Sequence, residues 1–236
     1  MKRLKYFVKK AFKLTDFIAI KKYLVLGDSH TTVFNNPLFK IHFPLSSFNV
    51  CNVTGATVSG LDNPRSKTDA LRIFREKIES KQKKAKKIIF LLGEVDAGFI
   101  IWYRAVKYGT TVEQMYLKAV SSYIKFLGEV PKDNEVLVIS APLPTIGDND
   151  IYGDVANLRK EVKATKLERT RLTIDFNNEI EKYCVSAGID YMNLDSISLG
   201  ENGVVKNKFH NKNKKNHHYD SVAYSKLIIS EIKKYL

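Results

Sequence analysis

Five short apolar runs constrain the fold of this chain more than any other feature. They cover residues 23–27, 48–53, 87–93, 135–141 and 189–194. Three of them are continuous (YLVLG, KIIFLLG and EVLVISA), as expected for strands covered on both faces. Between and after them lie segments with helical spacing of apolar residues, at 65–86, 111–127, 162–187 and 221–235. This alternation predicts an α/β fold in which helices cover both faces of a parallel sheet.

Small and polar residues follow the first three runs at once. Asp28-Ser29-His30 comes after the first, Thr54-Gly55-Ala56 after the second, and Gly93-Glu94-Val95-Asp96 ends the third. Two long loops, 142–161 and 195–217, follow the last two runs. Parallel strands end at one edge of the sheet, and open α/β sheets bind ligands there. The sequence therefore predicts one functional site built from these turns and loops.

The charge of the chain is unevenly distributed. The net charge is +14, and residues 1–22 carry eight basic residues against one acidic residue. Such charge favours anionic partners, yet the basic residues are mostly lysine, lack interleaved aromatic residues and match no nucleic-acid-binding motif. We expect no specific nucleic-acid partner. A hydrophobic content of 44% over 236 residues is sufficient for one globular domain, which we assign to residues 21–236.

Residues 1–20 read as a separate, basic amphipathic helix. Apolar residues at steps of three and four form one face, with lysines on the other: Leu4, Phe7, Val8, Ala11, Leu14 and Ile18. This helix either binds an anionic membrane surface or packs on the domain's own core. No apolar run is long enough to span a membrane, and no signal peptide is recognisable. The sequence thus predicts a cytoplasmic protein, with peripheral membrane attachment as an open alternative.

Ser29 is a candidate nucleophile, which requires a general base and donors for an oxyanion. Of the five histidines, His30 is expected to diverge from Ser29 at the turn, and His42 is expected to be structural. His217 and His218 come just before the last helix, where they either return to the Ser29 end of the sheet or cap that helix. Cysteine and histidine spacings that indicate a metal site are lacking, so no metal or other cofactor is expected.

Four segments in order resemble blocks I, II, III and V of the SGNH/GDSL hydrolase family: VLGDSHT, TGATVSG, LLGEVDAG and NHHYDSVAY. The resemblance spans roughly residues 23–235 and implies a three-layer α/β/α sandwich with a five-stranded sheet in the flavodoxin-like order 2-1-3-4-5. It implies that Ser29 is the nucleophile and that the backbone N–H groups of Ser29 and Gly55 bind the oxyanion. It further implies that His218 is the general base, with His217 as second choice.

Two departures from the family pattern concern the partners of Ser29. Block III of the family carries an asparagine oxyanion donor where this chain has Val95, and Arg104 is one candidate replacement. Block V carries an aspartate three residues before the histidine, where this chain has Lys215. Asn216 is a nearby group that could orient the imidazole instead. Asp28 is expected to shape its turn, and Glu94 and Asp96 to shape the site.

These observations predict a serine esterase that works through an acyl–Ser29 intermediate. Water as the acceptor gives an esterase, and a sugar hydroxyl gives an O-acyltransferase. By analogy with the family, we expect an acylated carbohydrate or other small ester as substrate, as in O-acetyl removal or transfer on surface polysaccharides. The alternative is a catalytically impaired protein of the same fold that binds an anionic glycan or a membrane surface.

Overall fold

The computed structural model describes residues 19–148, 162–213 and 216–236. Its centre is a five-stranded sheet in the order β2-β1-β3-β4-β5, and every strand pair is parallel. The predicted architecture and strand order 2-1-3-4-5 are confirmed. The strands are β1 (Lys21–Gly27), β2 (Ser46–Asn52), β3 (Lys87–Leu91), β4 (Glu135–Ile139) and β5 (Asp190–Met192).

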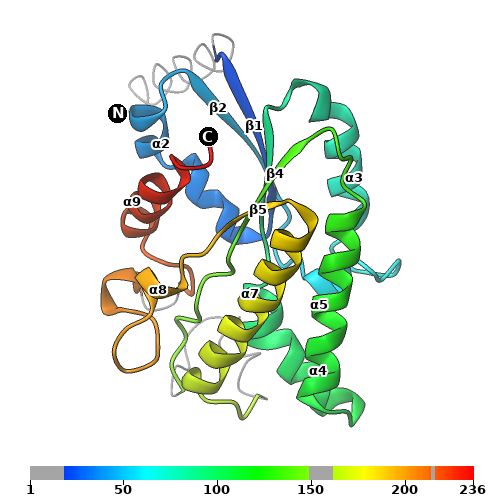
Figure 1. The fold of residues 1–236 in the computed structure, drawn as a ribbon. Helices are drawn as coiled ribbons and strands as arrows, with labels where there is room; N and C mark the ends of the chain where they lie inside the picture. Colours follow the sequence, from blue (N-terminus) through cyan, green and yellow to red (C-terminus); the bar gives the residue numbers. More distant parts are fainter. Residues whose placement is uncertain (1–18, 149–161, 214–215) are drawn as a thin grey trace, which may run out of the picture.

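Helices cover both faces of the sheet (Figure 1). On one face lie α3 (Ala70–Lys81), α5 (Val112–Gly128) and α7 (Lys166–Ala187), and on the other α2 (Pro37–His42) and α9 (Ser221–Ile232). Alternate side chains of a strand point to opposite faces. Accordingly Leu24 and Leu26 of β1 join the core under α3, α5 and α7, whereas Val25 joins the core under α2 and α9.

The predicted helix at 65–86 starts later and ends earlier than expected. Residues before α3 form successive turns, in which Asn63 accepts from the N–H of Ser66 and Ser66 accepts from the N–H of Asp69. Asp69 then has a left-handed backbone (φ 50°), so the helix begins only at Ala70. A short 3-10 turn, η3 (Gln82–Lys84), follows Lys81. The other three predicted helices are confirmed, with ends displaced by up to four residues.

Several short elements were not predicted, and most of them lie near the carboxyl edge of the sheet, the edge at which the strands end. They are too short for a periodic pattern to reveal. They comprise η1 (Ser29–Asn35), α2, η2 (Val58–Gly60), the π-helical turn η4 (Asp96–Ile100), α4 (Ile101–Tyr108), α8 (Asp195–Ser198) and η5 (Asn207–Phe209).

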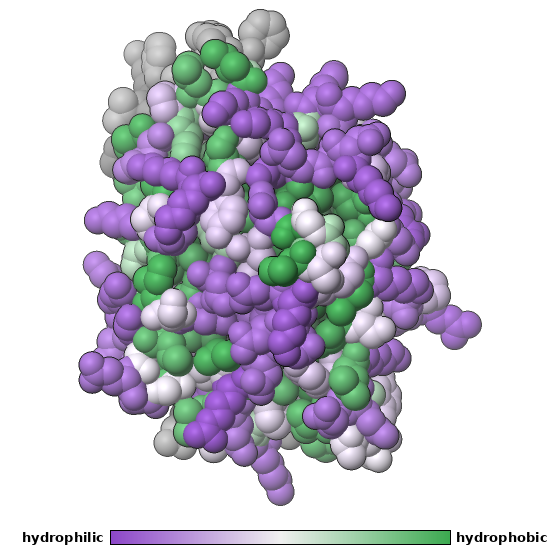
Figure 2. Space-filling view, in the orientation of Figure 1, coloured by the Kyte–Doolittle hydropathy of each residue, from purple (hydrophilic) through white to green (hydrophobic). Residues whose placement is uncertain are grey.

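No described helix is long and apolar enough to cross a membrane. The face of the molecule in Figure 2 is mainly hydrophilic, with apolar areas between the polar side chains. Of the predicted amphipathic helix at 1–20, residues 1–18 lie outside the described residues. Ile20, the last residue of that predicted helix, is described, and its side chain is 76% exposed.

Gly27, the last residue of β1, passes very close to the neighbouring backbone. A Cβ atom built there would lie 2.0 Å from the carbonyl oxygen of Leu91 and 2.6 Å from Cγ2 of Thr31. The next N–H, that of Asp28, donates to the same Leu91 oxygen at 3.4 Å. The absence of a side chain therefore lets β1 end against β3 and turn directly into Ser29.

We expect Gly27→Ala to lower the free energy of unfolding by about 2–3 kcal/mol, because the added methyl group meets backbone that cannot move alone. The matched control is Gly128→Ala in α5, where the nearest atom is the hydroxyl oxygen of Tyr183 at 3.2 Å. That helical substitution should be neutral or stabilise by about 0.5–1 kcal/mol. Urea unfolding measures both, and equal stabilities of the two variants would contradict the steric account.

Candidate active site

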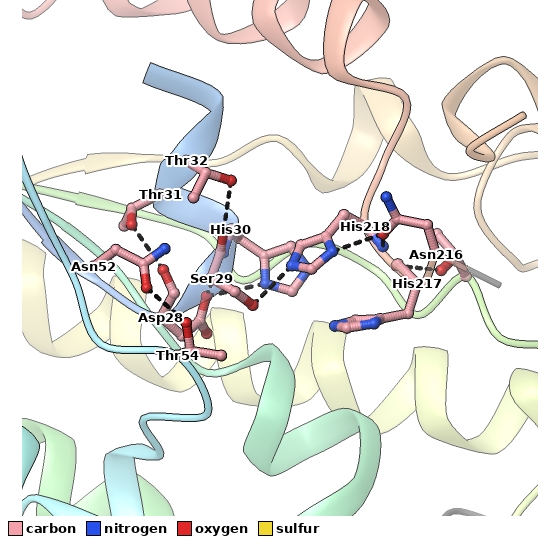
Figure 3. Close-up of polar contacts among 11 residues, drawn as sticks. Asp28, Ser29, His30, Thr31, Thr32, Asn52, Thr54, Asn216, His217 and His218 are labelled. Carbon is pink, nitrogen blue, oxygen red and sulfur yellow. Dashed lines mark hydrogen bonds and ion pairs between the residues drawn. The ribbon is translucent and has the colours of Figure 1, made fainter. Parts of the chain in front are cut away.

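Ser29 and His218 meet at the carboxyl edge although 189 positions separate them. Ser29 is the first residue of η1, directly after β1, and His218 precedes α9. Nε2 of His218 lies 2.7 Å from Oγ of Ser29 (Figure 3). The His218 loop is held from the β4 side, because the hydroxyl of buried Tyr219 accepts from the N–H of Leu143 at 2.8 Å. The histidine pair therefore does return to the Ser29 end of the sheet.

Asn216 orients the imidazole of His218. Its Oδ1 lies 2.8 Å from Nδ1 of His218 and accepts from the backbone N–H of His218 at 3.0 Å. Since a backbone N–H needs an acceptor, the amide oxygen and not the nitrogen faces the histidine. His218 then carries its proton on Nδ1, which leaves the lone pair of Nε2 for the hydroxyl of Ser29. Lys215, at the family's aspartate position, lies outside the described residues.

His217 takes a different position from His218. Its ring centroid lies 4.1 Å from that of His218, and its carbonyl oxygen accepts from the hydroxyl of Thr145. His218 contributes the hydrogen bond to Oγ of Ser29. Of the two candidates that the sequence left open, His218 thus has the geometry of a general base.

Asp28 shapes the turn that presents Ser29. It caps η1, accepting at Oδ1 from the N–H of His30 at 2.9 Å, and the same oxygen lies 3.0 Å from Nδ1 of His30. Both side chains are buried. This bond turns the His30 ring back towards the site, with its centroid 4.6 Å from that of His218. His30 was expected only to diverge from Ser29 at the turn; its bond to Asp28 nevertheless keeps its ring at the site, against His218.

Two backbone N–H groups are available for an oxyanion. Ser29 begins η1, and the first N–H of a helix has no acceptor within the helix. Gly55 has a left-handed backbone (φ 73°) in the turn after β2, where the neighbouring Ala56 N–H donates to Val53. In the part of the chain that the structure describes, the N–H of Gly55 donates to no other residue. Asn52 and Thr54, which donates to Asn52 at 3.1 Å, lie beside Ser29 (Figure 3).

Asp96 holds the second turn in place from inside the protein. Its carboxylate accepts from the N–H of Val58 at 2.7 Å, from the N–H of Ser59 at 3.2 Å and from the hydroxyl of Ser59 at 2.6 Å. Burial raises the pKa of Asp96 to about 6, although these hydrogen bonds and the charge of Arg104 lower it. Asp96 thus shapes the site by fixing the segment next to Gly55.

Arg104 does not take the place of the missing asparagine donor. Its Nη1 donates to the hydroxyl of Ser59 at 2.6 Å, so it belongs to the Asp96 network. Val95, a half-buried hydrocarbon side chain just before η4, cannot donate a hydrogen bond either.

Glu94 is buried at the same edge. Burial, together with the charges of Asp195 and Glu94, raises the pKa of the Tyr219 hydroxyl.

Sequence reasoning placed His30 and Thr54 in the turns at this edge without giving them a role, and it missed Asn52. The only available signal was their place at the ends of two adjacent strands, in register with Gly27 or directly after it. Among residues 19–148, 162–213 and 216–236, no group of three histidine, cysteine or acidic side chains could hold a metal ion.

The raised pKa of Asp96 makes stability depend on pH. The native state retains a proton that the unfolded chain releases near pH 4, so the free energy of unfolding falls as pH rises from about 4 to about 6. The free energy of unfolding falls by on the order of 2–3 kcal/mol in total. The fall is complete once the pH exceeds the pKa that Asp96 has in the folded protein. We expect Asp96→Asn to lose this part of the slope, as measured by urea unfolding across pH 4–8.

Asp195 is the control for this prediction, because burial raises its pKa to about 7 while Asn177 donates to its carboxylate. Asp195→Asn should retain the slope between pH 4 and 6 that Asp96 causes and flatten the profile closer to pH 7. An unchanged profile in Asp96→Asn would show that Asp96 does not carry the proton.

Comparison with known proteins relates the chain to others by structure alone. No protein-family profile matches the sequence, and no curated protein sequence matches it either. A GDSL-like lipase from Bacteroides thetaiotaomicron is similar in structure, with a TM-score of 0.58, 16% identity, and coverage of 97% of this chain and 98% of that one. A carbohydrate acetylesterase family member from Sinorhizobium meliloti has a TM-score of 0.58, 13% identity and coverage of 92% and 97%.

An acetyl xylan esterase is similar as well, with a TM-score of 0.54, 13% identity, and coverage of 91% of this chain and 99% of that one. Identities this low establish shared architecture and leave activity open. The sheet order, the helices on both faces and these matches together give the chain the fold of the SGNH/GDSL hydrolases.

Proposed function

We propose that the protein is a serine esterase that forms an acyl intermediate on Ser29. The observation that carries this proposal is the 2.7 Å contact between Nε2 of His218 and Oγ of Ser29. It is a nucleophile–base pair whose base is itself oriented by a third group, Asn216. A capping role for His218 would need no such contact, since Asp220 already caps α9.

In the first half of the reaction, Nε2 of His218 takes the proton of the Ser29 hydroxyl as Oγ attacks the acyl carbonyl carbon. The carbonyl oxygen becomes an oxyanion, which the N–H groups of Ser29 and Gly55 can stabilise by hydrogen bonds. The C–O bond to the leaving alcohol then breaks, and His218 returns its proton to the departing oxygen. The acyl group remains as an ester on Ser29.

In the second half, His218 deprotonates an acceptor hydroxyl, which attacks the acyl–Ser29 ester. Water as acceptor releases the free acid, whereas a sugar hydroxyl yields a transferred ester. In both cases Ser29 recovers its proton from His218. The chemistry needs no metal or other cofactor.

The proposed substrate is a small ester, with O-acetylated carbohydrate as the first choice. Support comes from two structural neighbours whose descriptions are an acetyl xylan esterase and a carbohydrate acetylesterase family member. Removal or transfer of O-acetyl groups during surface-polysaccharide metabolism fits this substrate class. The proposed location is cytoplasmic, with peripheral attachment to an anionic membrane surface through residues 1–20 as a further proposal.

Ser29→Ala should abolish labelling by a fluorophosphonate probe and reduce turnover of p-nitrophenyl acetate and of acetylated xylo-oligosaccharides by at least about three orders of magnitude, because the nucleophile is lost. His218→Ala should cause a comparable loss. The control is His42→Asn, because His42 lies in α2 and contacts the carbonyl oxygen of Leu38. Turnover that persists without Ser29 would refute the proposed intermediate.

A second candidate function rests on Val95. With a hydrocarbon where the family has an oxyanion donor, the protein could be an impaired relative that binds an anionic glycan or membrane surface. Loss of one such donor lowers the rate by about two to three orders of magnitude in enzymes that use it. If the esterase activity is weak, the missing donor at Val95 would account for it.

Val95→Asn distinguishes the two candidates by gain of function. If the chain is an esterase with an incomplete oxyanion site, the new amide should raise kcat on p-nitrophenyl acetate about tenfold or more. Val95→Leu is the control that adds volume without a donor. No gain over Val95→Leu, together with no labelling of Ser29, would favour the binding function.

A further inference from the structure

Two other segments of the carboxyl edge hold the loop that carries His218. In the segment after β4, the N–H of Leu143 donates to the hydroxyl oxygen of Tyr219 at 2.8 Å. The hydroxyl of Thr145, in the same segment, donates to the carbonyl oxygen of His217. These contacts fall on the residues directly before and after His218. The position of the imidazole therefore depends on the path of the segment after β4.

The segment after β5 reaches the same loop. The carbonyl oxygen of Phe209 accepts from the N–H of Asp220 at 2.8 Å, and the Phe209 ring stacks on Tyr219 with centroids 5.1 Å apart. Burial raises the pKa of the Tyr219 hydroxyl, and a hydrogen bond with Ser198 of α8 lowers it. Both segments thus converge on Tyr219.

Asn177 of α7 fastens both segments near their starts. Its Oδ1 accepts from the N–H of Ala141 at 2.8 Å, and its Nδ2 donates to the carbonyl oxygen of Ala141 at 3.0 Å. The same Nδ2 donates to the two carboxylate oxygens of Asp195 at 3.0 and 3.1 Å. Ala141 begins the segment after β4, and Asp195 begins α8 in the segment after β5. One buried side chain therefore fixes where both segments leave the sheet.

Resting on the proposed function, we propose that Asn177 is a positioning residue for His218, on which it acts through these two segments. A misplacement of about 1 Å at a catalytic group can lower the rate about 100-fold, even when its cause lies far from the reacting atoms. The 2.7 Å contact between His218 and Ser29 requires such accuracy. A planar amide suits the task, because it carries an acceptor oxygen and two donor hydrogens on one group.

A purely structural role would differ in its effect on His218. In that case Asn177 would only satisfy the buried polar groups of Ala141 and Asp195, and its loss would lower the free energy of unfolding. The imidazole of the molecules that remain folded would keep its place. A positioning role instead predicts a displaced His218 ring within the folded protein.

Asn177→Ala should lower kcat and kcat/KM for p-nitrophenyl acetate by an equal factor of about 10–100 and leave KM unchanged, because only the orientation of the base is lost. The NMR signal of the Nδ1 proton of His218 should shift in the same variant. The matched control is Phe74→Leu, which disturbs the buried core at α3 and none of these hydrogen bonds. An unchanged kcat and His218 signal in folded Asn177→Ala, or equal changes in Phe74→Leu, overturn the assignment.

The NMR measurement needs no substrate, so it separates this proposal from the proposed function. If the wild-type protein neither turns over esters nor labels with a fluorophosphonate, the proposed function fails. The His218 signal of Asn177→Ala, compared with that of Phe74→Leu, then still decides whether Asn177 positions the ring.

A second pair of variants keeps the test decisive if Asn177→Ala does not fold. Asn177→Asp retains the acceptor for the N–H of Ala141 but sets a second carboxylate against Asp195, and it should also lower kcat. Adding Asp195→Asn restores one amide–carboxylate contact with donor and acceptor exchanged. The double variant should recover kcat by about threefold or more and move the His218 signal back towards its wild-type position. A double variant with kcat no higher than that of Asn177→Asp overturns the proposal.

Discussion

Strand β1 pairs in parallel with β2 on one side and β3 on the other, and every feature of the site depends on this arrangement. The register sets Gly27 against Asn52 of β2 and Leu91 of β3, so three strands end side by side. The residues that follow each strand must then share one edge of the sheet. Gly27 makes the arrangement possible, because no side chain could fit between its backbone and that of Leu91.

Buried polar groups fix the turns that this register brings together. Asp96, from η4, accepts three hydrogen bonds from the segment after Gly55, and Asp28 holds both the start of η1 and the ring of His30. Burying each carboxylate is costly, as the raised pKa of Asp96 records. Such a cost is acceptable where rigid placement of donors and rings is what the site requires.

The two departures from the family pattern affect different properties of the site. Asn216 in place of a carboxylate keeps the orientation and tautomer of His218 but changes the local charge. A serine–histidine–asparagine arrangement parallels the cysteine–histidine–asparagine triad of some proteases, in which an amide orients the base. Val95 affects the opposite side of the reaction, where the oxyanion forms, and leaves the backbone N–H groups of Ser29 and Gly55 as the candidate donors. Asn216 therefore orients the base, whereas the N–H groups of Ser29 and Gly55 are the candidates for stabilising the oxyanion.

The sequence by itself determined the alternation of strands and helices and the edge at which Ser29 lies, because apolar periodicity and the turns after strands are local signals. The strand order was implied by the resemblance to the SGNH/GDSL family. The sequence also marked Ser29, Gly55 and the late histidine pair as candidates. It did not determine which histidine meets Ser29, that His30 turns back onto His218, or that Arg104 joins Asp96 instead of the oxyanion site. Only the tertiary structure decided these, because each depends on side-chain hydrogen bonds between segments that are far apart in the chain or buried in short turns without periodicity.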